Sequence, residues 1–84
     1  MAMKPLLEVD GDANAAYVTL EHGDVVRTRR LDDNRLLDLG LEGEVIGIEF
    51  LNVNHGVDLR ELPRQNELVR LFEQHHIPRL GEEA

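Results

Sequence analysis

The amino-acid sequence predicts a small α+β domain, in which an antiparallel β-meander of four to five strands is followed by a C-terminal helix. Residues 5–52 contain short runs of alternating apolar and polar residues, and after Pro63 the apolar residues recur at three- and four-residue steps. The connections between the runs are about two to five residues long, whereas parallel strands need crossovers of about a dozen. We therefore expect a single domain over residues 1–84, with the sheet in 5–52 and a helical extension in 53–84.

The first two predicted strands are separated by a turn. Residues 6–9 read Leu-Leu-Glu-Val, and residues 16–20 alternate apolar residues with Tyr17 and Thr19. Aromatic and β-branched residues at period two are typical of strands. Between the two runs, residues 10–14 read Asp-Gly-Asp-Ala-Asn, which is typical of turns because Asp and Asn side chains bond to the nearby backbone.

Three further strands are predicted at residues 25–31, 36–39 and 45–51. Turn-forming residues lie between the first two of these strands at 32–34, and Glu-Gly at 42–43 lies in the next connection. The strand at 25–31 carries charged residues on both faces. We therefore expect at least one of its faces to be in contact with water.

Gly47 interrupts the apolar strand at 45–51. A glycine inside a strand weakens it, unless another group approaches closely there or a bulge is needed. We predict that Tyr17 or a neighbouring aromatic side chain covers Gly47, and that Gly47→Val destabilises the fold.

The C-terminal helix is predicted over about residues 63–76. Proline is tolerated in a first helical turn, and Pro78 ends the pattern. The apolar positions recur at helical spacing, namely Leu68, Leu71, Phe72 and His75 or His76. Residues 54–62 have only weak helical character, because their apolar residues are too loosely spaced.

The composition excludes several classes of protein. The chain has 17 acidic and nine basic residues and a net charge of −8, which disfavours non-specific binding to a phosphate backbone. It has no cysteine, so disulfides, thiolate nucleophiles and cysteine-based metal sites are excluded. It contains no run of about 18 apolar residues and no signal-peptide pattern, so we expect a cytoplasmic protein that does not span a membrane.

We expect no enzymatic activity. Nucleophilic catalysis needs a nucleophile beside a base. The chain has no serine and no cysteine, and its two threonines, Thr19 and Thr28, lie within predicted strands. A sheet this small is also not expected to form a deep pocket that desolvates a pair of carboxylates.

We also expect no bound metal or cofactor. The adjacent histidines His75 and His76 diverge by about 100° on a helix, so only one of them can face a shared site. The acidic segments 10–14 and 32–34 resemble fragments of a calcium loop, but strands flank them where a calcium loop has helices. Turn chemistry explains both segments.

Four of the nine basic residues lie within nine positions, and they are Arg27, Arg29, Arg30 and Arg35. One interpretation is a patch for an anion or an acidic partner, because the guanidinium group matches carboxylates and phosphates. The other interpretation, which the acidic surroundings favour, is cross-strand pairing with acids of neighbouring strands, namely Glu21, Asp38 or Glu49.

We expect a homodimer, because the last three predicted strands carry apolar residues on both faces and one helix covers a single face. The residues assigned to partner binding are Arg27, Arg29, Leu37 and Leu39. A heterologous protein bound to the same face is the competing interpretation. A nucleic-acid-binding or regulatory module that uses the cluster Arg27–Arg35 is a further alternative, which the net charge and the three aromatic residues disfavour.

Three segments of the chain resemble the DUF2283 family of small bacterial and archaeal proteins. They are residues 12–20 (DANAAYVTL), 25–39 and above all 43–51 (GEVIGIEFL). The resemblance covers about residues 7–53 and implies a small antiparallel sheet with no assigned activity. Asn14 replaces the usual aspartate, and the chain continues about 30 residues past the usual end. The family also suggests an antitoxin-like or accessory role, so the predicted function is a non-enzymatic protein–protein interaction module.

Overall fold

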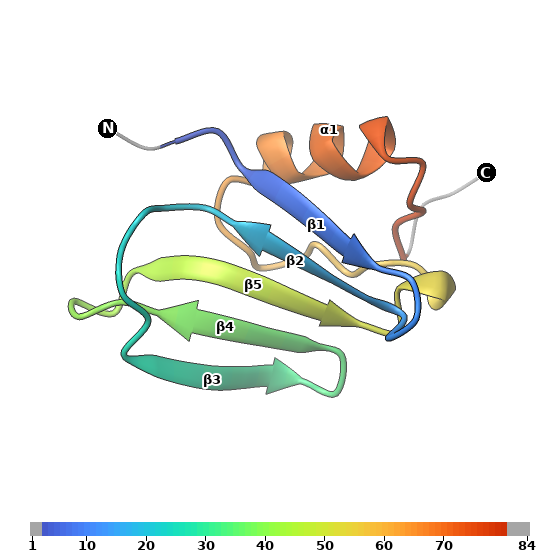
Figure 1. Cartoon of the computed structure of the whole chain (residues 1–84). Coiled ribbons are helices and arrows are strands. Elements are labelled where there is room, and N and C mark those ends of the chain that lie inside the picture. The colour runs from blue at the N-terminus through green and yellow to red at the C-terminus, as the bar shows by residue number, and fades with distance from the viewer. Residues whose placement is uncertain (1–2, 81–84) are drawn as a thin grey trace.

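The computed structural model describes residues 3–80, in which it contains five strands and one α-helix (Figure 1). The elements are β1 (Leu6–Asp10), β2 (Ala15–Thr19), β3 (Arg27–Asp32), β4 (Arg35–Leu39), β5 (Val45–Leu51), a 3₁₀ helix (Val53–His55) and α1 (Gln65–Gln74). The predicted α+β class, with an antiparallel sheet and a C-terminal helix, is confirmed. Residues 1–2 and 81–84 of the predicted domain lie outside the described residues.

The strand order differs from that of a continuous meander. It is β1-β2-β5-β4-β3, and all neighbouring strands are antiparallel. After β2, the chain crosses one end of the sheet to the far edge, where β3 begins (Figure 1). A meander would make the arginine-rich β3 the central strand, where its charged groups would lose water. The observed order instead places the apolar β5 in the centre.

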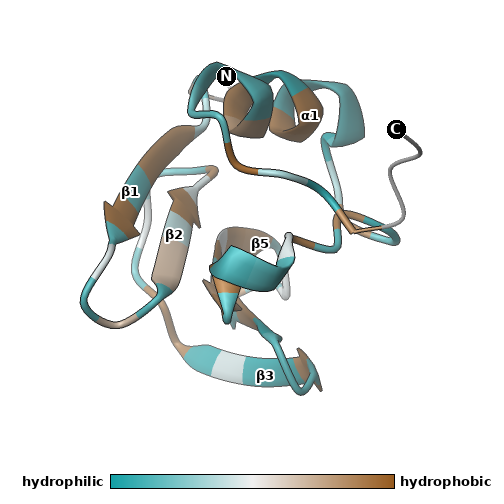
Figure 2. Ribbon diagram, turned by 90° about the vertical axis from the view of Figure 1, so that its right-hand side faces the viewer, coloured by the Kyte–Doolittle hydropathy of each residue, from teal (hydrophilic) through white to brown (hydrophobic). Residues whose placement is uncertain are grey.

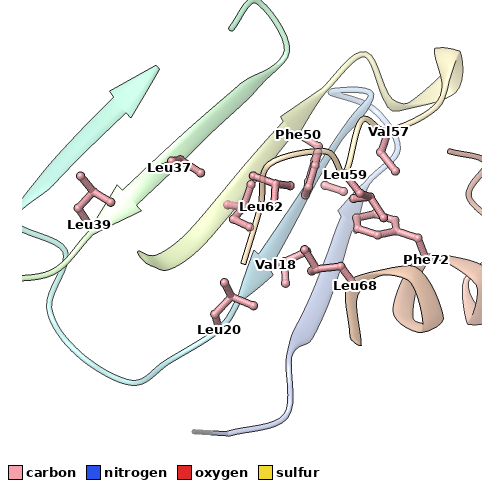
Figure 3. Packing of buried hydrophobic residues seen from close by; sticks show 12 residues of the cluster. Val18, Leu20, Leu37, Leu39, Phe50, Val57, Leu59, Leu62, Leu68 and Phe72 are labelled. Atoms are coloured by element: carbon pink, nitrogen blue, oxygen red, sulfur yellow. The ribbon is translucent and has the colours of Figure 1, made fainter. Parts of the chain in front are cut away.

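One face of the sheet carries the core, which Figure 3 shows from close by. Inward-facing residues of β2, β4 and β5 pack against the segment 57–62 and against α1. The rings of Phe50 on β5 and Phe72 on α1 meet edge to face, with centroids 5.2 Å apart. The buried cluster comprises Ala16, Val18, Leu20, Leu37, Leu39, Ile48, Phe50, Val57, Leu59, Leu62, Leu68 and Phe72.

The segment 54–62 is not helical beyond His55. Together with α1, it covers the core-facing side of the sheet. Val57 accepts a backbone hydrogen bond from Leu80 and donates one to Pro78, which ties the segment to the end of the described chain. The apolar side chains of 57–62 can therefore point into the core without helical periodicity.

The helix α1 is shorter than the predicted 63–76, because left-handed residues stop it at both ends. Arg64 has φ 57° and His76 has φ 58°, which a continuing α-helix does not allow. The Arg64 guanidinium group donates hydrogen bonds to the carbonyl oxygens of Leu20 and Met3 and to the Glu67 carboxylate. Arg64 thereby fastens the start of α1 to the sheet.

The acidic segments form turns, as predicted. Asp10 Oδ1 accepts a hydrogen bond from the backbone N–H of Ala13 at 3.1 Å, and Asp32 Oδ1 accepts one from Asn34 at 3.0 Å. Asn14 has φ 54°, and its Oδ1 accepts the backbone N–H of Asn54 at 3.0 Å. The asparagine at position 14 thus connects the first turn to the 3₁₀ helix.

Candidate binding surface

The strand β3 forms an open edge of the sheet. It pairs with β4 on one side only, and no other strand of residues 3–80 pairs with its second side. Every residue of β3 except Leu31 is exposed, and Figure 2 shows most of the strand in the hydrophilic colour. An open edge presents unpaired backbone N–H and C=O groups to which a further strand can add.

The structure brings the four predicted partner-binding residues together. Arg27 lies opposite Leu39 and Arg29 lies opposite Leu37, so all four share the core-facing side of the sheet. The two arginines are exposed. The two leucines are only 9% (Leu37) and 6% (Leu39) exposed and belong to the core. The assignment of the leucines to a partner surface therefore needs correction, because segment 57–62 and α1 complete a core on this face.

The predicted cross-strand ion pairs of Arg27 and Arg29 do not form. Thr28 lies opposite Asp38, and Tyr17 lies opposite Glu49, so these acids occupy the other face of the sheet. Within residues 3–80, neither Arg27 nor Arg29 makes an ion pair. The two guanidinium groups are thus available to an acidic ligand.

The other two arginines of the cluster bind inside the fold. Arg30 donates to the backbone carbonyls of Asp32 and Asp33, both at 3.1 Å. Arg35 is buried, and it donates to the Asp32 carboxylate at 2.7 Å and to the carbonyl of Arg60 at 2.6 Å. The Arg27–Arg35 cluster is therefore divided between the two faces of the sheet and the interior of the fold.

Asp58 joins Arg35 and Arg60. Its carboxylate lies 3.6 Å from the Arg35 guanidinium group and 2.9 Å from that of Arg60. The hydrogen bond from Arg60 is the largest influence that lowers the pKa of Asp58 to about 2. The hydrogen bond from Arg35 likewise lowers the pKa of Asp32. Both carboxylates are held in their charged form.

The face opposite the core carries a row of polar side chains across three strands. Tyr17 Oη and Thr28 Oγ1 each donate to the Asp38 carboxylate at 2.7 Å. Burial, together with this hydrogen bond and nearby acids, raises the pKa of Tyr17 above its usual value. The Tyr17 ring lies over Gly47, where an added Cβ would be 2.0 Å from Oη. The prediction that Tyr17 covers Gly47 is confirmed.

We expect Gly47→Val to lower the free energy of unfolding by about 1–3 kcal/mol, because the valine displaces the Tyr17 ring and breaks its hydrogen bond to Asp38. Urea denaturation measures the change. In a Tyr17→Ala background the collision is absent, so the same substitution should cost much less. Equal costs in the two backgrounds would show that Tyr17 does not restrict position 47.

Two further observations concern metal ions and membranes. In the described part of the chain, no three His, Asp or Glu side chains are grouped so that they could hold a metal ion. His75 ends α1, and its Nδ1 lies 2.9 Å from the carbonyl oxygen of Leu71. Among residues 3–80, no helix has the length and apolar character needed to cross a bilayer.

The second open edge of the sheet is β1, which the predicted meander also places at an edge. Leu6 is 55% and Val9 is 50% exposed on this strand. The strand order changes only the opposite edge, where β3 lies in place of the β5 that a meander predicts. The charge on β3 was the available signal, since three arginines in six residues favour an edge position.

A comparison with curated proteins and with solved structures gave no significant match. The family described as a protein of unknown function (DUF2283) matches residues 7–54, which contain almost all of β1 and the whole of the other four strands. The segment 57–62 and α1, which cover the sheet, lie beyond the match. Because the match spans more than half of the 84 residues, the chain belongs to the DUF2283 family.

Proposed function

We propose that this chain is a non-enzymatic protein-interaction module, in which the β3 edge binds an extended acidic segment of another protein. The observation that carries the proposal is the pair Arg27 and Arg29, exposed on an open edge and without an ion pair within residues 3–80. Acids outnumber bases by 17 to nine in this chain. Two arginines that face no acid are therefore unusual here.

The chemistry of the ligand follows from the geometry of the edge. An added strand makes backbone hydrogen bonds to β3, and its alternate side chains lie on the two faces of the extended sheet. Acidic residues two positions apart would lie beside Arg27 and Arg29 on the core-facing side. The antitoxin-like or accessory role suggested by the family resemblance is one use of such an edge.

A structural role for the same arginines is the competing explanation. Charged residues on an edge strand prevent sheets from pairing with one another. If Arg27 and Arg29 only protect the edge, their replacement should promote aggregation and should not weaken the binding of any ligand.

The test is the titration of a short peptide in which glutamate alternates with valine, followed by the backbone amide signals of the protein. We expect the largest changes along β3, and we expect Arg27→Glu/Arg29→Glu to weaken binding at least about tenfold by replacing attraction with repulsion. Arg70→Glu on α1 is the control, because it changes the charge on an exposed residue away from the edge.

Two results would contradict the proposal. The first is peptide binding that is equal in the wild type and in Arg27→Glu/Arg29→Glu. The second is an absence of peptide binding together with salt-sensitive binding of short single-stranded DNA or RNA, which would favour the nucleic-acid alternative.

A further inference from the structure

The other edge of the sheet, β1, has a different character from β3. Figure 2 shows apolar residues over much of β1, whereas β3 is mostly hydrophilic. Leu6 and Val9 are half-exposed, and no strand of the described chain pairs with the outer side of β1. An exposed edge with apolar side chains on both faces favours pairing with another strand.

We propose that β1 pairs with β1 of a second copy of this chain, in antiparallel orientation about a two-fold axis at Leu7. This contact joins two five-stranded sheets into one continuous sheet. It is closed and symmetric, as in most homo-oligomers. The surface is separate from the β3 edge, so the proposal does not depend on the binding of an acidic segment there.

The charges on β1 and the overlap of the two strands favour the register centred on Leu7. In an antiparallel pair about this axis, Lys4 lies opposite the partner's Asp10, and Leu6 lies opposite the partner's Glu8. By symmetry, the dimer contains two Lys4–Asp10 pairs of opposite charge, which stabilise it. An axis at Glu8 would place Glu8 opposite the partner's Glu8, and like charges directly opposite are destabilising. An axis at Leu6 would place Lys4 opposite the partner's Glu8, but it would shorten the overlap of the two strands.

The core-facing side of β1 is also complementary to itself in this register. Leu7 lies opposite the partner's Leu7, and Pro5 lies opposite the partner's Val9. Beside Pro5, between the N-terminal segment and α1, is a hollow of about 220 Å³ that is also lined by Leu71. The partner's Val9 would lie at the mouth of this hollow and become covered.

The alternatives that use β3 are less favourable for two copies. A symmetric β3 pair would place arginine opposite arginine, for example Arg29 opposite the partner's Arg29. A contact of β1 with the partner's β3 does bring opposite charges together, but the β1 edge and the β3 edge that it leaves open can pair with further copies. Such a contact would produce assemblies that grow with concentration.

Single cysteines test the register, because the chain contains none. Leu7→Cys places two thiols opposite each other at the axis, within the range that a disulfide spans. We expect mild oxidation to link Leu7→Cys into a covalent dimer, and to link Glu8→Cys and Thr28→Cys at least about tenfold more slowly. Rapid linkage of Glu8→Cys, or equal rates for all three variants, would overturn the proposed register.

Charge exchange tests the interface independently. The wild type is expected to have about twice the 9.6 kDa of one chain in sedimentation experiments. Lys4→Glu and Asp10→Lys should each raise the dimer Kd at least about tenfold, and the double variant should restore it. The restored dimer would also show that losing the Asp10 bond to Ala13 does not disrupt the fold. Asp12→Lys, a charge reversal outside the paired strand, is the control.

Several outcomes would refute the pairing of β1. A wild-type chain that stays monomeric on concentration would do so. A dimer that is unaffected by both single reversals would also do so, as would a double variant that remains dissociated although it is folded. An assembly whose mass increases continuously with concentration would instead support the contact between β1 and the partner's β3.

Discussion

Arg35→Met is expected to lower the free energy of unfolding by about 3–5 kcal/mol, the range for removing one partner of a buried ion pair. Arg35 is 5% exposed and binds the Asp32 carboxylate and the backbone carbonyls of Asp58 and Arg60. Methionine fills a similar volume but donates no hydrogen bond. The variant therefore leaves two carbonyls without their donor and removes the guanidinium partner of the Asp32 carboxylate.

Arg60→Met is the matched control for this prediction. Arg60 also pairs with Asp58, but its side chain is 83% exposed, against 7% for that of Arg35. Water screens ion pairs whose cation is this exposed, so Arg60→Met should cost much less stability than Arg35→Met. Urea denaturation of both variants at neutral pH measures the difference. Similar losses in the two variants would contradict the assignment of Arg35 as the buried anchor of segment 57–62.

The loss of stability at acidic pH provides a second test of the interactions between Arg35 and the carboxylates of Asp32 and Asp58. Asp58, with a pKa of about 2 against an ordinary 3.8, and Asp32, whose pKa is also lowered, both bind protons more weakly when the chain is folded. Their stabilising effect is complete above about pH 4 and is lost as the pH falls towards 2. In Arg35→Met the Asp32 pKa loses its main lowering influence, so the decline over this range should be smaller than in the wild type.

The extent of the strands follows from the sequence, but their order does not. Period-two alternation and turn residues depend on neighbouring positions, so the five strands were predicted to within a few residues. The pairing of β2 with β5 joins segments that lie about 30 residues apart. Local patterns do not determine such a pair. The charge on β3 argues against a central position for that strand, but it does not by itself identify β5 as the central strand.

Local sequence patterns also do not predict which arginines are exposed and which are buried. Arg29 and Arg35 are both arginines on strands, yet one is exposed and the other is buried. The difference arises because segment 57–62 brings Asp58 and two backbone carbonyls to Arg35. That segment lacks both helical and strand periodicity. Its contribution to the core, and with it the burial of Leu37 and Leu39, therefore required the three-dimensional structure.

Phe72→Ala tests the attachment of α1 to the sheet. Phe72 is fully buried, and its ring meets Phe50 of the central strand at 80° and 5.2 Å. Truncation of a buried phenylalanine costs about 3–5 kcal/mol through lost burial and the cavity that remains. Domains of this size have total stabilities of about 4–13 kcal/mol, so the variant is expected to be marginally folded.

The manner of unfolding distinguishes a shared core from a helix that packs independently. Because Phe72 contacts Phe50, we expect Phe72→Ala to lower the midpoint of a single transition, seen alike by circular dichroism for the helix and by amide signals of β5. Phe72→Leu should lose less because it retains more of the buried volume, and Leu41→Ala at an 85% exposed position should change the stability by less than about 0.5 kcal/mol. A Phe72→Ala variant in which the helix melts while β5 keeps wild-type stability would show that the sheet does not depend on α1. Coincident transitions would show that residues beyond the family match are part of the same core.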